Sequence, residues 1–315
     1  MAVFYRLVFF FKIKYDKILV KEQQEASGVL YLSAFDFPDG EQEAYFALSV
    51  KQTCYTTYYP FGIFPQKELA RLEFEPVTIL YGGNGSGKTT VLNVIGEKLG
   101  LTRGALYNRS CFFPQYLALC RAEFRRPIPR DSAIITSDDV FDAMLDLRAV
   151  NQGIDQNRDD LMEQYFRDKK GDLRLLSLAD YQRFRREVLA QRRSQSQYVR
   201  AQLAENQREC SNGERAFLIF TEQITQDRLY LLDEPENSLS PSRQVEFARF
   251  LADSARFYGC QFLISTHSPF FLAIREARIY DLDQNPVSVR PWTELENVRT
   301  YYQFFRDHQN EFEKG

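Results

Sequence analysis

The clearest signal in the sequence is the stretch Val77–Thr90, which reads VTILYGGNGSGKTT. Its first residues, Val77–Tyr81, are apolar or β-branched and predict a buried strand. The pattern G-x-x-x-x-G-K-[ST] then runs from Gly82 to Thr89, and apolar residues recur at helical spacing as far as Leu99. A strand, a glycine-rich loop and a helix in this order predict a phosphate-binding site.

The residue types of the loop suit this chemistry. Its glycines let backbone N–H groups approach phosphate oxygens, and the following helix adds the partial positive charge of its N-terminus. Lys88 can reach the β- and γ-phosphates of a nucleotide, and Thr89 can hold Mg²⁺. The predicted nucleotide-binding residues are Gly82, Gly83, Asn84, Gly85, Ser86, Gly87, Lys88, Thr89 and Thr90.

Composition sets the class of protein. The 315 residues are 44% hydrophobic and 26% charged, as is ordinary for a soluble globular protein, and the net charge of −3 gives no general attraction to nucleic acid. The five cysteines are scattered without metal-ligand spacing, which predicts reduced thiols in the cytoplasm. The opening MAVFYRLVFFF is too short to span a bilayer and lacks a signal-peptide cleavage site, so a strand is the better interpretation and no membrane span is expected.

The first 75 residues are expected to be β-rich, with strands over 3–11, 28–34, 44–50 and 55–64. Three tyrosines precede the glycine-rich loop, namely Tyr55, Tyr58 and Tyr59. One of them could stack on an adenine ring, although core or surface packing is the commoner role of such residues.

The rest of the chain alternates helices and strands, which predicts a mainly parallel sheet covered by helices. A capping-box pattern at Thr293–Glu296 predicts the start of a C-terminal helix. The expected helices cover 138–148, 155–170, 181–206, 216–224 and 241–258, and the expected strands cover 228–232 and 261–265.

Two of these strands end at polar side chains, Asp233–Glu234 and Thr266–His267. In an open parallel sheet, ligands bind beyond the carboxyl ends of the strands, so these groups should converge with the glycine-rich loop on one nucleotide. Asp233 is placed to hold Mg²⁺, Glu234 to orient and polarise the attacking water, and His267 to contact the γ-phosphate. Lys88, Glu234 and His267 are therefore the candidate catalytic residues.

Five ordered motifs over residues 55–285 resemble those of ABC-type ATPases, in the branch of SMC, RecF and OLD-family heads. The phosphate loop resembles a Walker A motif, and Leu229–Pro235 a Walker B motif. Glu236–Pro241 stands where that family has its D-loop, and Ser265–Pro269 where it has its switch histidine. The signature motif of this branch, S-x-G-E, is matched by Ser211, Asn212, Gly213 and Glu214.

The resemblance implies an ATPase that uses Mg²⁺ and dimerises head to tail around two ATP molecules. The signature of one subunit would close on the γ-phosphate held by the other subunit's Walker A motif, and hydrolysis through Glu234 would release the dimer. The fold implied is an α/β P-loop NTPase with an antiparallel, β-rich N-terminal part and a helical lobe between Walker A and signature. The expected parts of this single domain are 1–75 (β-rich), 76–100 (Walker A), 101–208 (helical lobe), 209–285 (signature to switch histidine) and 286–315 (C-terminal helix).

The sequence also departs from the family pattern. The signature is not LSGGQ, and Ser240 stands where transporter D-loops often have Asp, which weakens a transporter interpretation. Gln115 is a candidate for the Q-loop glutamine, which contributes to the metal site in this family, but it follows Lys88 closely. The chain between Lys88 and Ser211 is too short for the long coiled coil of an SMC protein, and no nuclease domain is recognisable.

Three functions remain open at this point. The first is a stand-alone ATPase of this type that drives a separately encoded effector in DNA maintenance or phage defence. The second is a RecF-like DNA-binding ATPase, in which an arginine-rich helix contacts the DNA backbone. The third is the ATP-binding subunit of a transporter, which would need a membrane partner. The arginines in question are Arg183, Arg185, Arg186, Arg192 and Arg193.

Overall fold

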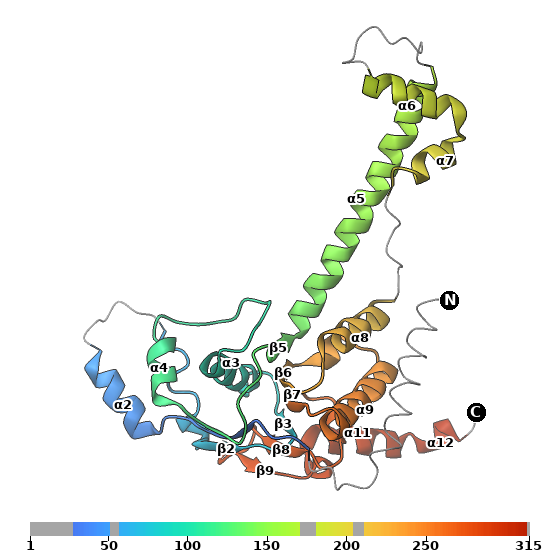
Figure 1. Ribbon diagram of the computed structural model, residues 1–315. Coiled ribbons are helices and arrows are strands. Elements are labelled where there is room, and N and C mark those ends of the chain that lie inside the picture. The colour runs from blue at the N-terminus through green and yellow to red at the C-terminus, as the bar shows by residue number, and fades with distance from the viewer. Residues whose placement is uncertain (1–27, 51–56, 171–180, 204–210, 314–315) are drawn as a thin grey trace. The chain divides into compact units, whose positions relative to one another are not determined.

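The computed structural model describes residues 28–50, 57–170, 181–203 and 211–313, without the side chains of 181–183 (Figure 1). The chain divides into two compact units. Unit 1 comprises Met1–Val140 and Ala216–Gly315, and unit 2 comprises Phe141–Arg215. The predicted strand at 3–11 and the side chains of Tyr55 and Arg183 lie outside the described residues.

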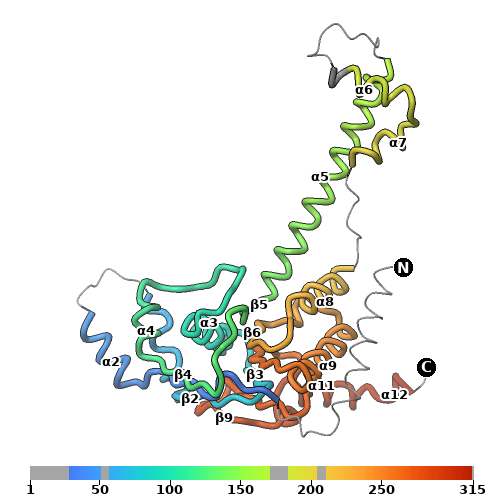
Figure 2. Tube along the Cα trace, viewed as in Figure 1, coloured from blue at the N-terminus to red at the C-terminus, as the bar shows by residue number. Residues whose placement is uncertain are grey.

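Unit 1 is built on a six-stranded sheet that brings together distant parts of the sequence (Figure 2). Its first five strands are parallel to their neighbours, and the last pairs antiparallel. The predicted mainly parallel sheet is therefore confirmed. In spatial order the strands are β5 (Ala133–Thr136), β6 (Leu229–Asp233), β7 (Gln261–Ser265), β3 (Val77–Tyr81), β8 (Arg278–Asp281) and β9 (Ser288–Val289).

The central strands are apolar along their whole length because helices cover both faces of the sheet. Every residue of β3 and of β7 is buried. Figure 1 shows α3 (Lys88–Leu99) on one side of these strands and α8 (Asn212–Gln223) and α9 (Pro241–Phe257) on the other. A parallel sheet covered in this way needs continuous apolar runs rather than alternation, which is what β3 and β7 provide.

A second, antiparallel sheet carries the strand order β2 (Arg71–Glu73), β1 (Leu32–Asp36), β4 (Arg121–Phe124). The side chain of Gln261, only 2% exposed, joins it to β7. The Gln261 amide oxygen accepts hydrogen bonds from the backbone N–H groups of Tyr31 (2.8 Å) and Leu32 (2.9 Å), and its nitrogen donates to the Leu32 carbonyl (2.8 Å). One hydrophobic core, which includes Phe35 and Leu263, runs through both sheets.

The N-terminal part contains a helix where a strand was predicted. Residues 44–50 belong to α2 (Gly40–Ser49), which begins at a capping box formed by Asp39 and Gln42. Tyr45 and Leu48 are 77% and 85% exposed, so the aromatic and aliphatic residues of this stretch do not mark a buried strand. The prediction of a strand over 55–64 is also wrong for its described part, because residues 57–64 form turns before η1 (Pro65–Lys67).

The described part of unit 2 contains α5 (Ser137–Lys169, which begins in unit 1), α6 (Tyr181–Arg192), α7 (Gln195–Arg200) and the first turn of α8. Two separate predicted helices are one continuous α5. The predicted helix 181–206 is instead interrupted at Ser194, which caps α7 through its side chain. Tyr165 and Tyr198 lie in a small apolar cluster, and the Tyr198 hydroxyl donates to Asp168 (2.9 Å).

The C-terminal part of unit 1 ends in α11 (Glu296–Asp307) and α12 (Gln309–Phe312), so the predicted C-terminal helix is present. The predicted capping box at Thr293–Glu296 is wrong, because Leu295 is the N-cap residue and its side chain makes no cap bond. In the part of the chain that is described, no helix is both long and apolar enough to cross a membrane. The remaining short helices are α4 (Phe113–Leu119), η3 (Pro235–Ser238), α10 (Pro269–Leu272) and η4 (Trp292–Glu294).

Candidate nucleotide site

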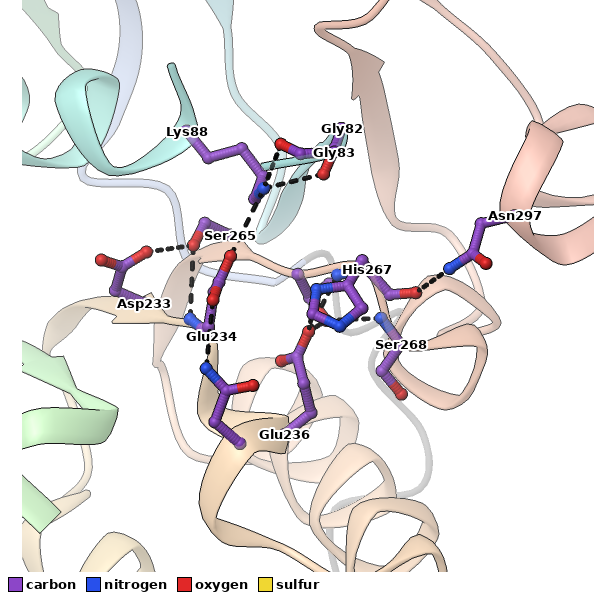
Figure 3. Close-up of polar contacts among 12 residues, drawn as sticks. Gly82, Gly83, Lys88, Asp233, Glu234, Glu236, Ser265, His267, Ser268 and Asn297 are labelled. Atoms are coloured by element: carbon purple, nitrogen blue, oxygen red, sulfur yellow. Dashed lines mark hydrogen bonds and ion pairs between the residues drawn. The ribbon is translucent and has the colours of Figure 1, made fainter. Parts of the chain in front are cut away.

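The glycine-rich loop connects β3 to α3 at the carboxyl edge of the sheet. Gly85 and Gly87 adopt φ values of +80° and +96°, a left-handed conformation that favours glycine. The Lys88 ammonium folds back over the loop and donates to the carbonyls of Gly82 (2.7 Å) and Gly83 (3.0 Å), as Figure 3 shows. Lys88 is only 4% exposed, so its charge is fixed at the position where phosphates would bind.

The first turn of α3 offers donors for an anion. Its N-cap residue is Gly87, which has no side chain to accept a bond from the helix N-terminus. The N–H groups of Lys88, Thr89 and Thr90 have no intrahelical acceptor, because the first helical bond runs from the Val91 N–H to the Gly87 carbonyl (2.9 Å). These donors and the helix dipole suit a nucleotide phosphate.

Asp233 lies at the end of β6, directly beside Ser265 at the end of β7 in the paired strands. One Asp233 oxygen accepts from the Thr89 hydroxyl (3.2 Å) and from the Ser265 hydroxyl. Burial raises the pKa of Asp233, and the hydrogen bonds from Ser265 and Thr89 oppose this shift. A hydroxyl and a carboxylate in contact are suitable ligands for Mg²⁺, which usually takes one or two carboxylates together with substrate phosphates.

Glu234 follows Asp233 in the left-handed conformation, with φ +46° and ψ +53°. Its backbone N–H donates to the Ser265 carbonyl (3.0 Å). One carboxylate oxygen lies 3.4 Å from the Lys88 ammonium, and the other accepts from the Asn237 amide (3.1 Å). The turn thereby aims the Glu234 carboxylate back at the phosphate loop (Figure 3). A carboxylate in this place can take a proton from a water molecule that attacks a bound phosphate.

His267 lies two residues beyond the end of β7, and its side chain is 42% exposed. Its backbone N–H donates to Glu236 (2.8 Å), and its carbonyl accepts from the Asn297 amide (2.9 Å) at the start of α11. A pocket of about 450 Å³ is lined by residues 81–84 of the phosphate loop region, by His267 and by Asn297. One ligand can therefore contact both the loop and the histidine.

The predicted signature residues lie at the start of α8, in unit 2. Ser211 and Glu214 form a capping box: the Glu214 N–H donates to the Ser211 hydroxyl (3.4 Å), and the Ser211 N–H donates to the Glu214 carboxylate (3.3 Å). The Arg148 guanidinium donates to the Asn212 side chain (2.6 Å), which ties this helix start to α5. The S-x-G-E pattern is thus, physically, a helix N-terminus.

Two other predicted residues make different contacts. Gln115 lies exposed on α4, where its amide can donate to the carbonyls of Cys111 (3.1 Å) and Phe112 (3.2 Å), and none of its described contacts is to Thr89 or Asp233. Tyr58 stacks on Phe112, with ring centroids 4.9 Å apart. The Tyr59 hydroxyl donates to Thr90 (3.2 Å), so Tyr59 is the described tyrosine that touches the phosphate helix.

Sequence reasoning did not find the roles of Ser265, Asn237, Glu236 and Asn297. Ser265 and Asn237 contact Asp233 and Glu234 directly, while Glu236 and Asn297 hold the His267 backbone. A usable signal existed for three of them, since Ser265 begins the Ser265–Pro269 motif, and Glu236 and Asn237 begin the Glu236–Pro241 motif. No local pattern marks Asn297, because its contact depends on how α11 packs.

Comparison with known proteins gives a partial family match. Residues 120–273 match the family described as "AAA domain, putative AbiEii toxin, Type IV TA system". This segment covers just under half of the chain and includes the predicted signature residues, Asp233, Glu234 and His267; the phosphate loop precedes it. No curated protein matches the chain in sequence.

Among solved structures, the chain is similar to a putative metal-chelate type ABC transporter in an inward-facing conformation, with 13% identity over 88% of this chain and 89% of that chain and a TM-score of 0.37. It is also similar to the Pyrococcus furiosus Smc head domain bound to the C-terminal domain of ScpA, with 13% identity over 75% and 95% and a TM-score of 0.36. The SMC head domain of Thermotoga maritima gives 13% identity, 83% and 99% coverage and a TM-score of 0.35. At these TM-scores the likenesses support no conclusion about this chain.

The class of protein follows from the features above. A mainly parallel sheet, a phosphate loop after β3 and polar residues at the ends of β6 and β7 define an ATP-binding P-loop NTPase. Within that class, residues 120–273 match the model of the AAA-domain family named above.

Proposed function

We propose that this protein hydrolyses ATP at the site between the glycine-rich loop and the ends of β6 and β7. The observation that carries the proposal is the position of Glu234, whose carboxylate lies 3.4 Å from the Lys88 ammonium. Phosphate bound over Lys88 would therefore lie next to a carboxylate able to accept a proton from the attacking water. His267, on the same pocket, would contact the terminal phosphate.

In this proposal Thr89 and Asp233 hold Mg²⁺ together with the nucleotide phosphates. The described residues contain no cluster of three or more His, Cys, Asp or Glu side chains that would bind a metal without a nucleotide. Such a site suits Mg²⁺, which keeps most of its ligands as water and phosphate oxygens. The contacts of Gln115 give no support for its participation.

We further propose that two copies assemble head to tail around two ATP molecules. The helix start at Ser211–Glu214 supports this, because a capped helix N-terminus with a glycine at its first turn can donate to a phosphate held by a second copy. Moving such a pair from mostly open to mostly closed requires about 5 kcal/mol of preferential binding. Several charge-assisted bonds at each of two sites can supply that amount.

The partner that this cycle drives is proposed to be a separately encoded effector in a cytoplasmic defence or DNA-maintenance module. The description of the matched family supports this, since it names a putative toxin and a toxin–antitoxin system. The function of the module itself rests on that family analogy rather than on the site.

The experiment that tests the proposal is light scattering of the Glu234→Gln variant with and without Mg-ATP, alongside a phosphate-release assay of the wild type. Binding without turnover should trap a dimer only when ATP is present. Lys88→Ala is the matched control, because it removes a charge at the same site and should prevent both binding and assembly. Native turnover by Glu234→Gln would contradict the role given to Glu234.

A second candidate function, binding of nucleic acid, is favoured by two basic surfaces. On unit 2, Arg185, Arg186, Arg192 and Arg193 are exposed, and Arg186 also lies 3.7 Å from Asp168. On unit 1, a hollow of about 510 Å³ is lined by Lys98, Arg125 and Arg126 together with the exposed Phe124. Cations beside an aromatic ring suit a phosphate backbone and a stacked base.

These surfaces can be tested separately by charge reversal at Arg192 and Arg193 or at Arg125 and Arg126. If the protein binds DNA through one of them, only that double variant should lose affinity, and the wild-type affinity should fall steeply with added salt. Absent or salt-insensitive binding would rule out this second function.

A further inference from the structure

Glu236 is a buried acid that the proposed mechanism does not use. It follows Pro235 within η3 and is 7% exposed. Its carboxylate points at the loop that carries His267, as Figure 3 shows. Burying a carboxylate costs free energy unless hydrogen bonds or an opposite charge compensate for the lost water. The contacts of Glu236 should therefore indicate what it does.

One oxygen of Glu236 receives all of its described contacts. Oε1 accepts from the Thr266 hydroxyl (2.6 Å) and from the His267 backbone N–H (2.8 Å). The same oxygen lies 3.3 Å from Nδ1 of the His267 ring. Glu236 therefore contacts the switch histidine at both its backbone and its side chain.

The loop around His267 is also held from its other side. The Ser268 N–H donates to the Thr266 hydroxyl (3.0 Å), and the Asn297 amide donates to the His267 carbonyl (2.9 Å). With the backbone fixed by these bonds, the remaining freedom of His267 is the orientation and protonation of its ring. The contact between Nδ1 and Glu236 bears on both.

The chemistry of Oε1 determines which ring nitrogen carries the proton. A backbone N–H can only donate, so Oε1 is an acceptor whether or not the carboxyl is protonated on Oε2. A ring nitrogen 3.3 Å from that oxygen is more favourable as N–H than as a lone pair, which favours the proton on Nδ1. Nε2, which has no partner among the described residues, is then the nitrogen available to a ligand.

We propose that Glu236 is a positioning residue for His267: it holds the proton on Nδ1 and thereby leaves Nε2 to face the terminal phosphate. This inference rests on the proposed ATPase function. When the ring takes a second proton on Nε2, that N–H donates to a γ-phosphate oxygen, while Nδ1–H stays on Glu236. The γ-phosphate and Oε1 of Glu236 then accept from the two ring N–H groups on opposite sides of the ring.

The inference can be tested without nucleotide, because the chain contains two histidines, His267 and His308. Ring ¹⁵N shifts of histidine-labelled protein, recorded well above the histidine pKa of about 6.5, report which nitrogen carries the proton. We expect the Nδ1–H form for His267 in the wild type and in Glu236→Gln, whose amide oxygen can still accept. Glu236→Ala should shift His267 towards the Nε2–H form, with His308, assigned by His308→Gln, as the internal reference.

The matched control is Glu43→Ala. Glu43 is also 7% exposed, but its carboxylate accepts from the Gly62 N–H rather than from the switch loop. It should leave the His267 ring shifts unchanged. An Nε2–H form of His267 in the wild type would overturn the inference, and this result does not depend on whether Glu236→Ala folds.

A second measurement tests whether Glu236 acts through His267. Glu236→Ala should lower kcat for ATP, by about 10- to 100-fold if the loss resembles that of removing the hydrogen-bond partner of a metal-ligating histidine, and KM should change little. The double variant with His267→Ala should lose no more than His267→Ala alone. If the kcat loss of the double variant equals the product of the two single losses, the inference is overturned. Absence of hydrolysis in the wild type would defeat the proposed function but leave the ring shifts as an independent result.

Discussion

The two units fix their functional residues in different ways. In unit 1, the site residues leave from the ends of strands that are buried along their whole length, such as β3 and β7. In unit 2, Asn212 stands at a helix start that one described side-chain bond, from Arg148, joins to α5. Sheet register therefore determines the geometry of the nucleotide site, while the predicted signature lies at the first turn of a helix and depends on how that helix start is held. Mutations in the two units should consequently separate nucleotide binding from turnover.

The largest effect should come from Lys88→Ala. This change removes a buried ammonium aimed at the phosphate position, so nucleotide binding and hydrolysis should fall by about 100-fold or more. Isothermal titration with ATP and a phosphate-release assay would measure the two losses. If Lys88→Ala still bound ATP with the wild-type affinity, the Lys88 ammonium would not be part of the phosphate site.

Arg148→Ala should have the next largest effect. It removes the charged bond to Asn212, and such bonds contribute about 1.5 to 3 kcal/mol, which corresponds to roughly tenfold or more in turnover if the signature must be held in place. ATP affinity of the isolated protein should not change. A loss of affinity would show that the two units are not separable. Arg158→Ala, on the same helix, is the control.

Asp233→Asn should separate stability from activity within unit 1. Burial raises the pKa of Asp233 above its value in the unfolded chain, about 3.9, so the folded state binds more protons between the two pKa values. Wild-type stability should therefore fall, relative to the variant, as pH rises through that window, and then stay constant. Thermal melts across pH without Mg²⁺ or nucleotide would show this. The variant should also lose hydrolysis.

Tyr198→Phe should have the smallest effect and should be confined to unit 2. It removes the hydroxyl that donates to Asp168 within the small apolar cluster, which should cost about 1 kcal/mol of unfolding free energy. Urea denaturation would measure the loss, and ATP titration should give the wild-type affinity. A large change in ATP affinity would contradict the conclusion that unit 1 alone determines nucleotide binding.

Sequence patterns predicted the elements around the nucleotide site well for a physical reason. β3 and β7 are short apolar runs with a glycine-rich loop or a polar motif directly after them, and α9 begins at Pro241 after Ser240 and ends before Gly259. At these places the apolar pattern and the residues that begin or end an element indicate the same bounds. Their bounds could therefore be predicted without knowledge of the tertiary structure.

Patterns failed where local signals competed. Tyr45 and Phe46 favoured a strand, but the capping box at Asp39 starts a helix there instead. Tyr45 lies on the solvent-exposed side of this helix, α2. Ser194 interrupted what resembled one long helix, because its side chain and that of Gln197 cap α7. The contact between Asp233 and Ser265 depends on the pairing of β6 with β7, which no single stretch of sequence specifies.

The buried amide of Gln261 has a consequence for how the molecule opens. Because it hydrogen-bonds the backbone of Tyr31 and Leu32, the antiparallel sheet is coupled to the strand that leads to His267. The amide hydrogens of Tyr31 and Leu32 should then exchange with solvent only in the rare openings that also expose β7. The two sheets of unit 1 would behave as one cooperative folding unit, although they share no strand.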